Sequence, residues 1–433
     1  MRSFVLHVIL AILMLLPFTR TVEAEEESTT FKWGFRERIR QEYIMNAFDM
    51  ENDLADDRNH IRLRTQLWFS YSPIEDLEIY AKINNEHRHY FKPDPDLDFD
   101  EFIHEFIFEN LYVKFSNIAG TPISAVIGRQ NIIYGEGFLY MDGGPLDGSR
   151  TQYMNAVKVT AAFEERSIEV HALSDPKRDQ YLPVVNSQDK DLIEWDEAGG
   201  GIYYTDTSLP KAKLEGYYFY KRQKHEETVI PASKIHTIGA RLSGEPIDWL
   251  SYAMEGAYQT GKQVGEYDIG ALGGYAYATA ALPAALEPKL TLGAIYLSGD
   301  DQETQEYEGW NPLYSRWPKW SDLYIYTLAT ESGVAYWQNF SAPFAKLSLK
   351  PLERLTLVGT IYLMGAPQES AAWWSDLFAS GSDRGVLSIV KLNWSWTEYL
   401  SGHLQWERFD PGDYYVEGSD PAHFLRWEFN FIY

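Results

Sequence analysis

The chain has 433 residues, no cysteine and a formal net charge of −25 at pH 7. The acidic charge argues against nucleic-acid binding, because neutralising phosphates requires clustered lysine and arginine. The lack of cysteine excludes disulfides, thiolate metal ligands and cysteine nucleophiles. Aromatic residues make up 15% of the sequence, which is a high share.

The first 24 residues have the layout of a cleavable secretory signal. Arg2 supplies a positive charge, residues 5–18 form a nearly continuous apolar run, and Val22-Glu23-Ala24 precedes an acidic stretch. The apolar run is shorter than the about 20 residues of a membrane-spanning helix, so a retained anchor is the less favoured alternative. No later segment resembles such a helix, so membrane insertion would have to use strands. Residues 1–24 are therefore expected to be cleaved, and residues 25–433 to form one domain.

Residues 58–72 show the predicted strand pattern clearly. Apolar Ile61 and Leu63 alternate with polar Arg62 and Arg64, and a period of two is typical of a strand with one apolar and one polar face. Similar segments recur along the chain and predict about eighteen strands. Their expected ranges are 32–43, 58–72, 76–90, 103–117, 121–132, 150–164, 166–174, 198–206, 211–222, 233–244, 248–260, 267–282, 287–298, 336–349, 352–364, 386–397, 400–408 and 421–433.

The connections between these segments alternate in length. Tight turns such as Ser72-Pro73 and Lys350-Pro351 alternate with long polar loops such as residues 46–57 and 91–102. This rhythm is typical of an outer-membrane barrel with short periplasmic turns and long extracellular loops. The predicted fold class is therefore all-β, a membrane-spanning antiparallel up-and-down β-barrel of about 18 strands, with a soluble β-protein as the alternative. An even strand number would place both termini in the periplasm of a Gram-negative bacterium.

The final strand carries alternating Leu425, Trp427, Phe429, Phe431 and Tyr433 on one face. This face is expected to meet lipid, and rings near the strand ends to form aromatic girdles at the membrane boundary. The strand must pair with the first one, because an open edge in hydrocarbon leaves backbone groups unpaired. The terminal aromatic also resembles the signal that the outer-membrane assembly machinery recognises. The expected partners therefore include membrane lipid, lipopolysaccharide and that machinery.

The polar faces of the strands assign a set of basic residues to the barrel lumen. Several belong to the first three strands, so a basic stripe along one inner wall is expected. Arginine presents a flat fork that matches carboxylates, so such a stripe would favour anions. The alternative is that these cations pair across strands with Glu42, Glu78, Glu86 and Glu428 and keep the wall rigid. The candidates are Arg36, Arg38, Arg40, Arg62, Arg64, Lys82, Arg88, Lys158 and Arg426.

Residues 127–159 are the most distinctive stretch. Gly128-Arg129-Gln130 is followed by Tyr134-Gly135 and by a return through Asp147-Gly148-Ser149-Arg150. This pattern resembles the alginate export family of outer-membrane porins. The resemblance implies an eighteen-stranded barrel that passes an anionic polysaccharide outward through an arginine-lined constriction. By motif position it implies Arg129 and Arg150 as lining residues, then Arg62 and Arg64. A structural pair of Arg129 with Glu109 or Asp147 is the alternative.

No catalytic motif is present, since GxSxG, HExxH, GxGxxG and P-loop patterns are all absent. The carboxylates of residues 94–101 are of a type that binds calcium, but they lack the glycine and final spacing of an EF-hand loop. No cofactor is therefore predicted, and loop-bound calcium is the weaker alternative. The predicted function is passive passage, in the export direction, of an anionic polysaccharide or another anionic or polar solute. A general or solute-specific uptake porin is the first alternative, and a barrel enzyme or adhesin the second.

Overall fold

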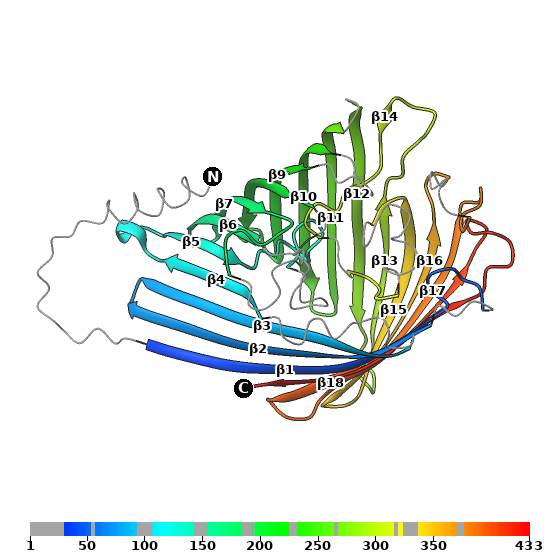
Figure 1. The fold of residues 1–433 in the computed structure, drawn as a ribbon, viewed down its shortest axis with the longest axis horizontal. Helices are drawn as coiled ribbons and strands as arrows, with labels where there is room; N and C mark the ends of the chain where they lie inside the picture. The colour runs from blue at the N-terminus through cyan, green and yellow to red at the C-terminus, as the bar shows by residue number, and fades with distance from the viewer. Residues whose placement is uncertain are drawn as a thin grey trace, which may run out of the picture.

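The wall of the molecule is one β-sheet that closes on itself into a barrel (Figure 1). The structure, a computed structural model, describes residues 30–52, 57–92, 106–142, 154–183, 193, 195–224, 232–263, 267–315, 319–323, 337–369 and 376–433. The predicted signal peptide and the acidic segment 94–101 lie outside these residues. Among the described residues, no helix is long and apolar enough to cross a membrane.

Over the described residues, eighteen antiparallel strands form the wall, and a two-residue strand, β14, pairs in parallel with β12. The strands are β1 (Thr30–Met45), β2 (Arg58–Ile74), β3 (Leu77–Lys92), β4 (Ile107–Phe115), β5 (Ile123–Gln130), β6 (Met154–Ala162), β7 (Arg166–Asp175), β8 (Glu197–Asp206), β9 (Ala212–Gln223), β10 (Ser233–Ile247), β11 (Leu250–Gln263), β12 (Asp268–Ala281), β13 (Lys289–Leu297), β14 (Glu306–Tyr307), β15 (Phe340–Leu352), β16 (Leu355–Gly365), β17 (Asp383–Ser395), β18 (Leu400–Pro411) and β19 (Ala422–Ile432).

Each predicted strand segment overlaps one observed wall strand, which confirms the barrel. Several strand ends differ from the predicted ranges by two to four residues, and two of these differences have a clear physical reason. The range 121–132 ran too far, because Ile132 continues the alternation but is buried in a loop after β5. The range 336–349 began too early, because Asn339 has a φ of 51° and breaks the extended backbone before β15.

The outward faces of the strands are strongly apolar. Ile238, Leu292 and Leu363 expose 64%, 57% and 54% of their surface, although each lies within a strand. A soluble protein rarely exposes so much contiguous apolar surface, whereas a lipid-facing wall requires it. Exposed rings gather at one end of the barrel, where β1 begins and β19 ends. This "short-turn end" carries Phe31, Trp33, Tyr71, Phe163, Trp249, Trp396, Tyr399 and Tyr433.

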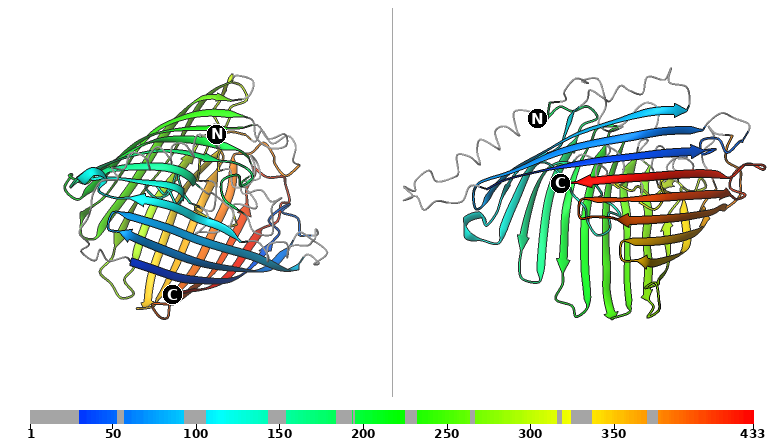
Figure 2. Two further views of the ribbon diagram at one scale, coloured as in Figure 1. Left: turned by 60° about the vertical axis from the view of Figure 1, so that its left-hand side comes forward. Right: turned by 90° about the horizontal axis from the view of Figure 1, so that it is seen from below.

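The barrel closes through pairing of β1 with β19, as expected from the last strand (Figure 2). The register runs from Arg36 opposite Ile432 to Met45 opposite His423. Phe35 and Tyr433 exchange two backbone hydrogen bonds of 2.9 and 2.8 Å, and the rings of Trp33 and Tyr433 lie 5.6 Å apart. Closure therefore satisfies the backbone groups that an edge would leave open.

An apolar cluster lies inside the barrel. It is built largely by two segments, residues 131–142 and residues 307–315 with 319–323, which we call the inner loops. Tyr134, Phe138, Trp310 and Tyr314 in these loops are at most 6% exposed. They contact inward-facing wall residues, and the Tyr134 ring stacks 4.2 Å from that of Tyr203 on β8. Part of the interior is therefore packed with protein.

Candidate functional site

Four adjacent wall strands present arginines to the interior. We call this set the arginine wall, because its members face inward from β1, β2, β3 and β19, which are hydrogen-bonded neighbours. Its members are Arg36, Arg38, Arg40, Arg62, Arg64, Arg88 and Arg426.

Several of these arginines stand directly opposite one another. The register places Arg38 opposite Arg64, and Arg40 opposite Arg62, which in turn faces Arg88 on β3. Like charges directly opposite on antiparallel strands are destabilising. Such rows can persist only where anionic groups compensate them.

Two buried glutamates supply much of this compensation. Glu86 on β3 accepts hydrogen bonds from Arg38 (3.0 Å), Arg62 (3.0 Å) and Arg64 (2.8 Å). Glu42 on β1 lies 3.0 Å from Arg40 and also pairs with Arg426. The pairing of cations across strands is therefore observed in the arginine wall.

The central arginines are also deeply covered. Arg38, Arg40, Arg62 and Arg64 are at most 2% exposed, so in this conformation a solute reaches them only after neighbouring groups move. Their pore-lining role remains a prediction. The other predicted lining residues lie apart: Lys82 pairs with Glu109 at 2.7 Å, and Lys158 with Glu169 at 3.0 Å.

Arg129 on β5 has a structural role in this conformation, because it binds neighbouring segments. Its Nη1 lies 2.9 Å from Asp179, a carboxylate that sequence analysis did not single out. Its Nε donates to Asn155 at 2.9 Å, and its Nη1 to the carbonyl of Phe108 at 2.9 Å. Arg129 thus fastens β5 to β6 and to the segment after β7. Arg150 and Asp147, which the motif also implied, lie outside the described residues.

The structure explains why a glycine precedes Arg129 in the same motif. Gly128 has a φ of 129°, and a Cβ there would lie 2.3 Å from the carbonyl oxygen of Leu111 on β4. Only glycine fits this backbone without displacing the neighbouring strand.

Gly128→Ala is therefore expected to lower the free energy of unfolding by about 1–3 kcal/mol, the usual cost of a strained backbone site. Urea unfolding in detergent, followed by the gel mobility of folded and unfolded barrel, measures the change. Gly216→Ala is the matched control, because nothing lies within 4 Å of a Cβ there. Equal midpoints for the two variants would contradict the steric argument.

The two inner loops bind each other through their backbones. Tyr314 donates to the carbonyl of Leu139 at 3.0 Å, and Met141 donates to the carbonyl of Tyr314 at 3.4 Å. The Ser315 hydroxyl also donates to the carbonyl of Gly137. The inner loops therefore behave as one unit inside the barrel.

Residues 131–142 are fastened to the wall by Glu136. Its carboxylate accepts hydrogen bonds of 2.7 Å from Arg241 on β10 and of 2.7 Å from the Tyr277 hydroxyl on β12. Lys319 of the other inner loop donates to the Glu136 carbonyl, and desolvation lowers the pKa of Lys319 to about 8. Glu136 thus links both inner loops to one side of the wall.

Residues 319–323 are held on the opposite side, beside the arginine wall. Asp322 pairs with Arg426 at 2.9 Å. The backbone groups of Asp322 and Leu323 donate to Glu407 on β18 at 3.1 and 3.2 Å. The inner loops therefore bridge the interior from β10 and β12 to β18 and β19, and any solute must pass around them or displace them.

Comparison with known families decides which class of barrel this is. The family model described as alginate export matches residues 30–423. The chain belongs to the alginate export family. Members of this family are outer-membrane channels rather than enzymes, so this chain is an outer-membrane channel. No curated protein sequence matches the chain.

Solved structures show that this alginate export family member shares its fold with another group of barrels. Pseudomonas aeruginosa OccK2 (OpdF), in complex with glucuronate, has a TM-score of 0.58 at 10% identity, covering 93% of this chain and 97% of that chain. Acinetobacter baumannii OccAB4 has a TM-score of 0.57 at 10% identity, covering 94% and 100%. Pseudomonas aeruginosa OccK11 (OpdR) has a TM-score of 0.52 at 11% identity, covering 92% and 95%.

Proposed function

We propose that this channel gives passive passage, in the export direction, to an anionic polysaccharide. The arginine wall carries this proposal, because rows of opposed arginines have a cost in a structural wall. That cost is explained if a passing anion shares the guanidinium groups with Glu42 and Glu86. Neighbouring strands lie about 4.8 Å apart, so the rows offer closely spaced contacts for successive carboxylates once the groups that cover them move. Such weak, distributed attraction is what conduction requires.

The comparisons support an anionic solute in two ways. The family model carries the description alginate export. The OccK2 structure is a complex with glucuronate, so a barrel of this fold accommodates a sugar carboxylate. In the proposed orientation both termini and the short turns are periplasmic, and the long acidic loops contact lipopolysaccharide outside the cell.

One observation favours a second candidate, which is passage of a small anionic or polar solute in the uptake direction. The inner loops occupy part of the interior, and Tyr140, Leu313 and Tyr314 among them are fully buried. A packed interior suits a small molecule better than a polymer. The two candidates differ in the largest solute that enters.

Ion selectivity in planar bilayers tests the proposal. The wild type is expected to be anion-selective in a KCl gradient and to be blocked by oligouronates added at the short-turn end. Arg40→Gln with Arg62→Gln is expected to abolish most of the selectivity and the block, because it removes one opposed pair. Arg166→Gln is the control, since Arg166 is exposed at the start of β7.

Block that persists as the uronate chain is lengthened supports the polysaccharide, whereas block by monomers and dimers alone supports the small solute. Cation selectivity that the double substitution leaves unchanged would mean that acidic residues govern the pore. The polyanion proposal would then be abandoned.

A further inference from the structure

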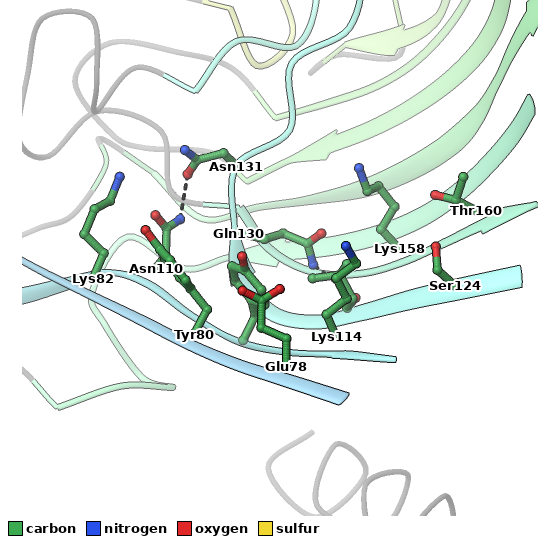
Figure 3. A pocket seen from close by; sticks show the side chains of 12 residues that line it. Glu78, Tyr80, Lys82, Asn110, Lys114, Ser124, Gln130, Asn131, Lys158 and Thr160 are labelled. Carbon is green, nitrogen blue, oxygen red and sulfur yellow. Dashed lines mark hydrogen bonds between the residues drawn. The ribbon is translucent and has the colours of Figure 1, made fainter. Parts of the chain in front are cut away.

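A cavity of about 470 Å³ opens on the inner wall near the short-turn end and reaches Asn131, where the first inner loop begins. It lies over the ends of β3, β4, β5 and β6 that meet the short turns, and its lining includes Tyr80, Tyr112, Lys82, Lys114 and Lys158. Figure 3 shows the labelled side chains converging on the hollow from neighbouring strands. This cavity is separate from the arginine wall and has more exposed side chains.

Stacked aromatic rings line one side of this region. The rings of Tyr80 and Tyr112 are 5.0 Å apart with planes 16° from parallel, and Trp68 on β2 continues the row, 6.3 Å from Tyr80. All three alternate with outward residues such as Ile79 and are half-buried, so part of each ring is accessible from the interior. Tyr80 lies between the other two rings, whereas Tyr112 has only Gly128 as its register partner on β5. Outside the inner loops, most exposed rings of this barrel face outward. An accessible inward ring platform is suited to the apolar face of a sugar ring.

One lysine in the cavity has no partner among the residues that the structure describes. Within the described part of the chain, the Lys114 side chain forms neither an ion pair nor a hydrogen bond, whereas Lys82 and Lys158 each pair with a glutamate. Glu78 stands opposite Lys114 in the register, but its carboxylate accepts a hydrogen bond from Ser70 at 2.7 Å. Lys114 is therefore available to a carboxylate in the cavity.

Small polar groups complete the lining. Ser124 and Thr160 stand opposite each other on β5 and β6, and both line the cavity. The Gln130 amide donates to the carbonyl groups of Val126 and Ala156, each at 3.1 Å, which leaves its own oxygen as an acceptor. Hydroxyl and amide groups of this kind bind sugar hydroxyls, so the cavity offers a ring platform, a cation and polar partners together.

We propose that this cavity binds a carboxylated sugar ring, with Tyr80 and Tyr112 as the stacking platform and Lys114 binding the carboxylate. The proposal rests on the proposed function and assigns the solute class as uronate. In the proposed orientation the cavity lies at the periplasmic entrance. The cavity binds one sugar unit of the polysaccharide before the solute reaches the inner loops and the arginine wall.

Calorimetric titration of the purified barrel in detergent tests this site. The probes are a trimeric oligouronate and a neutral trisaccharide of the same linkage. Lys114→Gln is expected to weaken oligouronate binding about tenfold, the value of one charge-assisted hydrogen bond, and to leave the weaker binding of the neutral sugar unchanged. Tyr112→Ala is expected to weaken binding of both probes, because it shortens the platform.

Lys346→Gln is the matched control, since Lys346 is an exposed residue that alternates with outward Leu347 on β15 at another part of the wall. Heat-modifiable gel mobility shows that each variant is folded. Wild-type affinity in both Lys114→Gln and Tyr112→Ala would overturn the site while the channel function stands. If the wild type binds no oligouronate and its current is not blocked by it, the site and the proposed function both fail.

Discussion

Replacement of residues 131–142 by a short glycine–serine linker is expected to raise the single-channel conductance several-fold. These residues lie inside the barrel and bind the second inner loop through Tyr314, so their removal frees space and loosens the other loop. An eighteen-stranded barrel without internal packing is wide enough for an aqueous channel. Conductance in planar bilayers at fixed KCl concentration measures the gain.

A point substitution tests the contacts that hold residues 131–142 to the wall separately from the volume that these residues occupy. Glu136→Ala removes the contacts to Arg241 and Tyr277, while Arg241 keeps its 2.6 Å hydrogen bond to Glu215. The variant is expected to show frequent transitions to a higher conductance. Glu165→Ala, in the exposed turn between β6 and β7, is the control. Wild-type conductance in both the linker variant and Glu136→Ala would place the inner loops outside the path of ions.

Glu86→Gln is expected to lower the free energy of unfolding by about 3–5 kcal/mol, the cost of removing one member of a buried ion-pair network. Glu86 is shared by three buried arginines on β1 and β2, so its charge offsets several repulsions at once. Urea unfolding in detergent measures the loss. Glu353→Gln, in the exposed turn after β15, carries the same charge change and is expected to leave stability unchanged.

Glu86→Gln is also expected to change the ion selectivity of the channel. Loss of the Glu86 charge makes the arginine wall more positive, so anion selectivity is expected to rise if ions pass beside it. Lower stability with unchanged selectivity would assign the wall a purely structural role. Unchanged stability would contradict the contacts between Glu86 and the arginines.

The fold was predictable because alternation is a local signal. A lipid-facing strand must place apolar residues at every second position, and the segment 267–282 therefore anticipated β12 (Asp268–Ala281) almost to the residue. Closure of the barrel was predictable for a related reason. The last strand, β19, has a lipid-facing side, so the backbone groups at its edge must pair with another strand. The inner loop at 131–142 was not predictable, because Tyr134, Phe138 and Tyr140 bury their rings without a regular period.

The interior chemistry was only partly predictable. Alternation assigned Arg40 and Arg62 to the inner face, but the register that sets them opposite each other depends on turn geometry between strands. The Asp179 partner of Arg129 comes from a distant segment that no local pattern connects to β5. Trp68 was a missed signal, because the alternation of residues 58–72 already placed this large ring on the polar face.

The charge pattern between β1 and β19 also disfavours errors of register where these two strands close the barrel. In the observed register Glu42 faces Arg426, and Arg40 faces Glu428. A slip of two residues in one direction would set Arg40 against Arg426, and in the other direction Glu42 against Glu428. Both errors keep the apolar faces toward lipid, so hydrophobic burial alone cannot reject them. The electrostatic penalty of pairing β1 with β19 in a wrong register therefore selects one shear for the closed barrel.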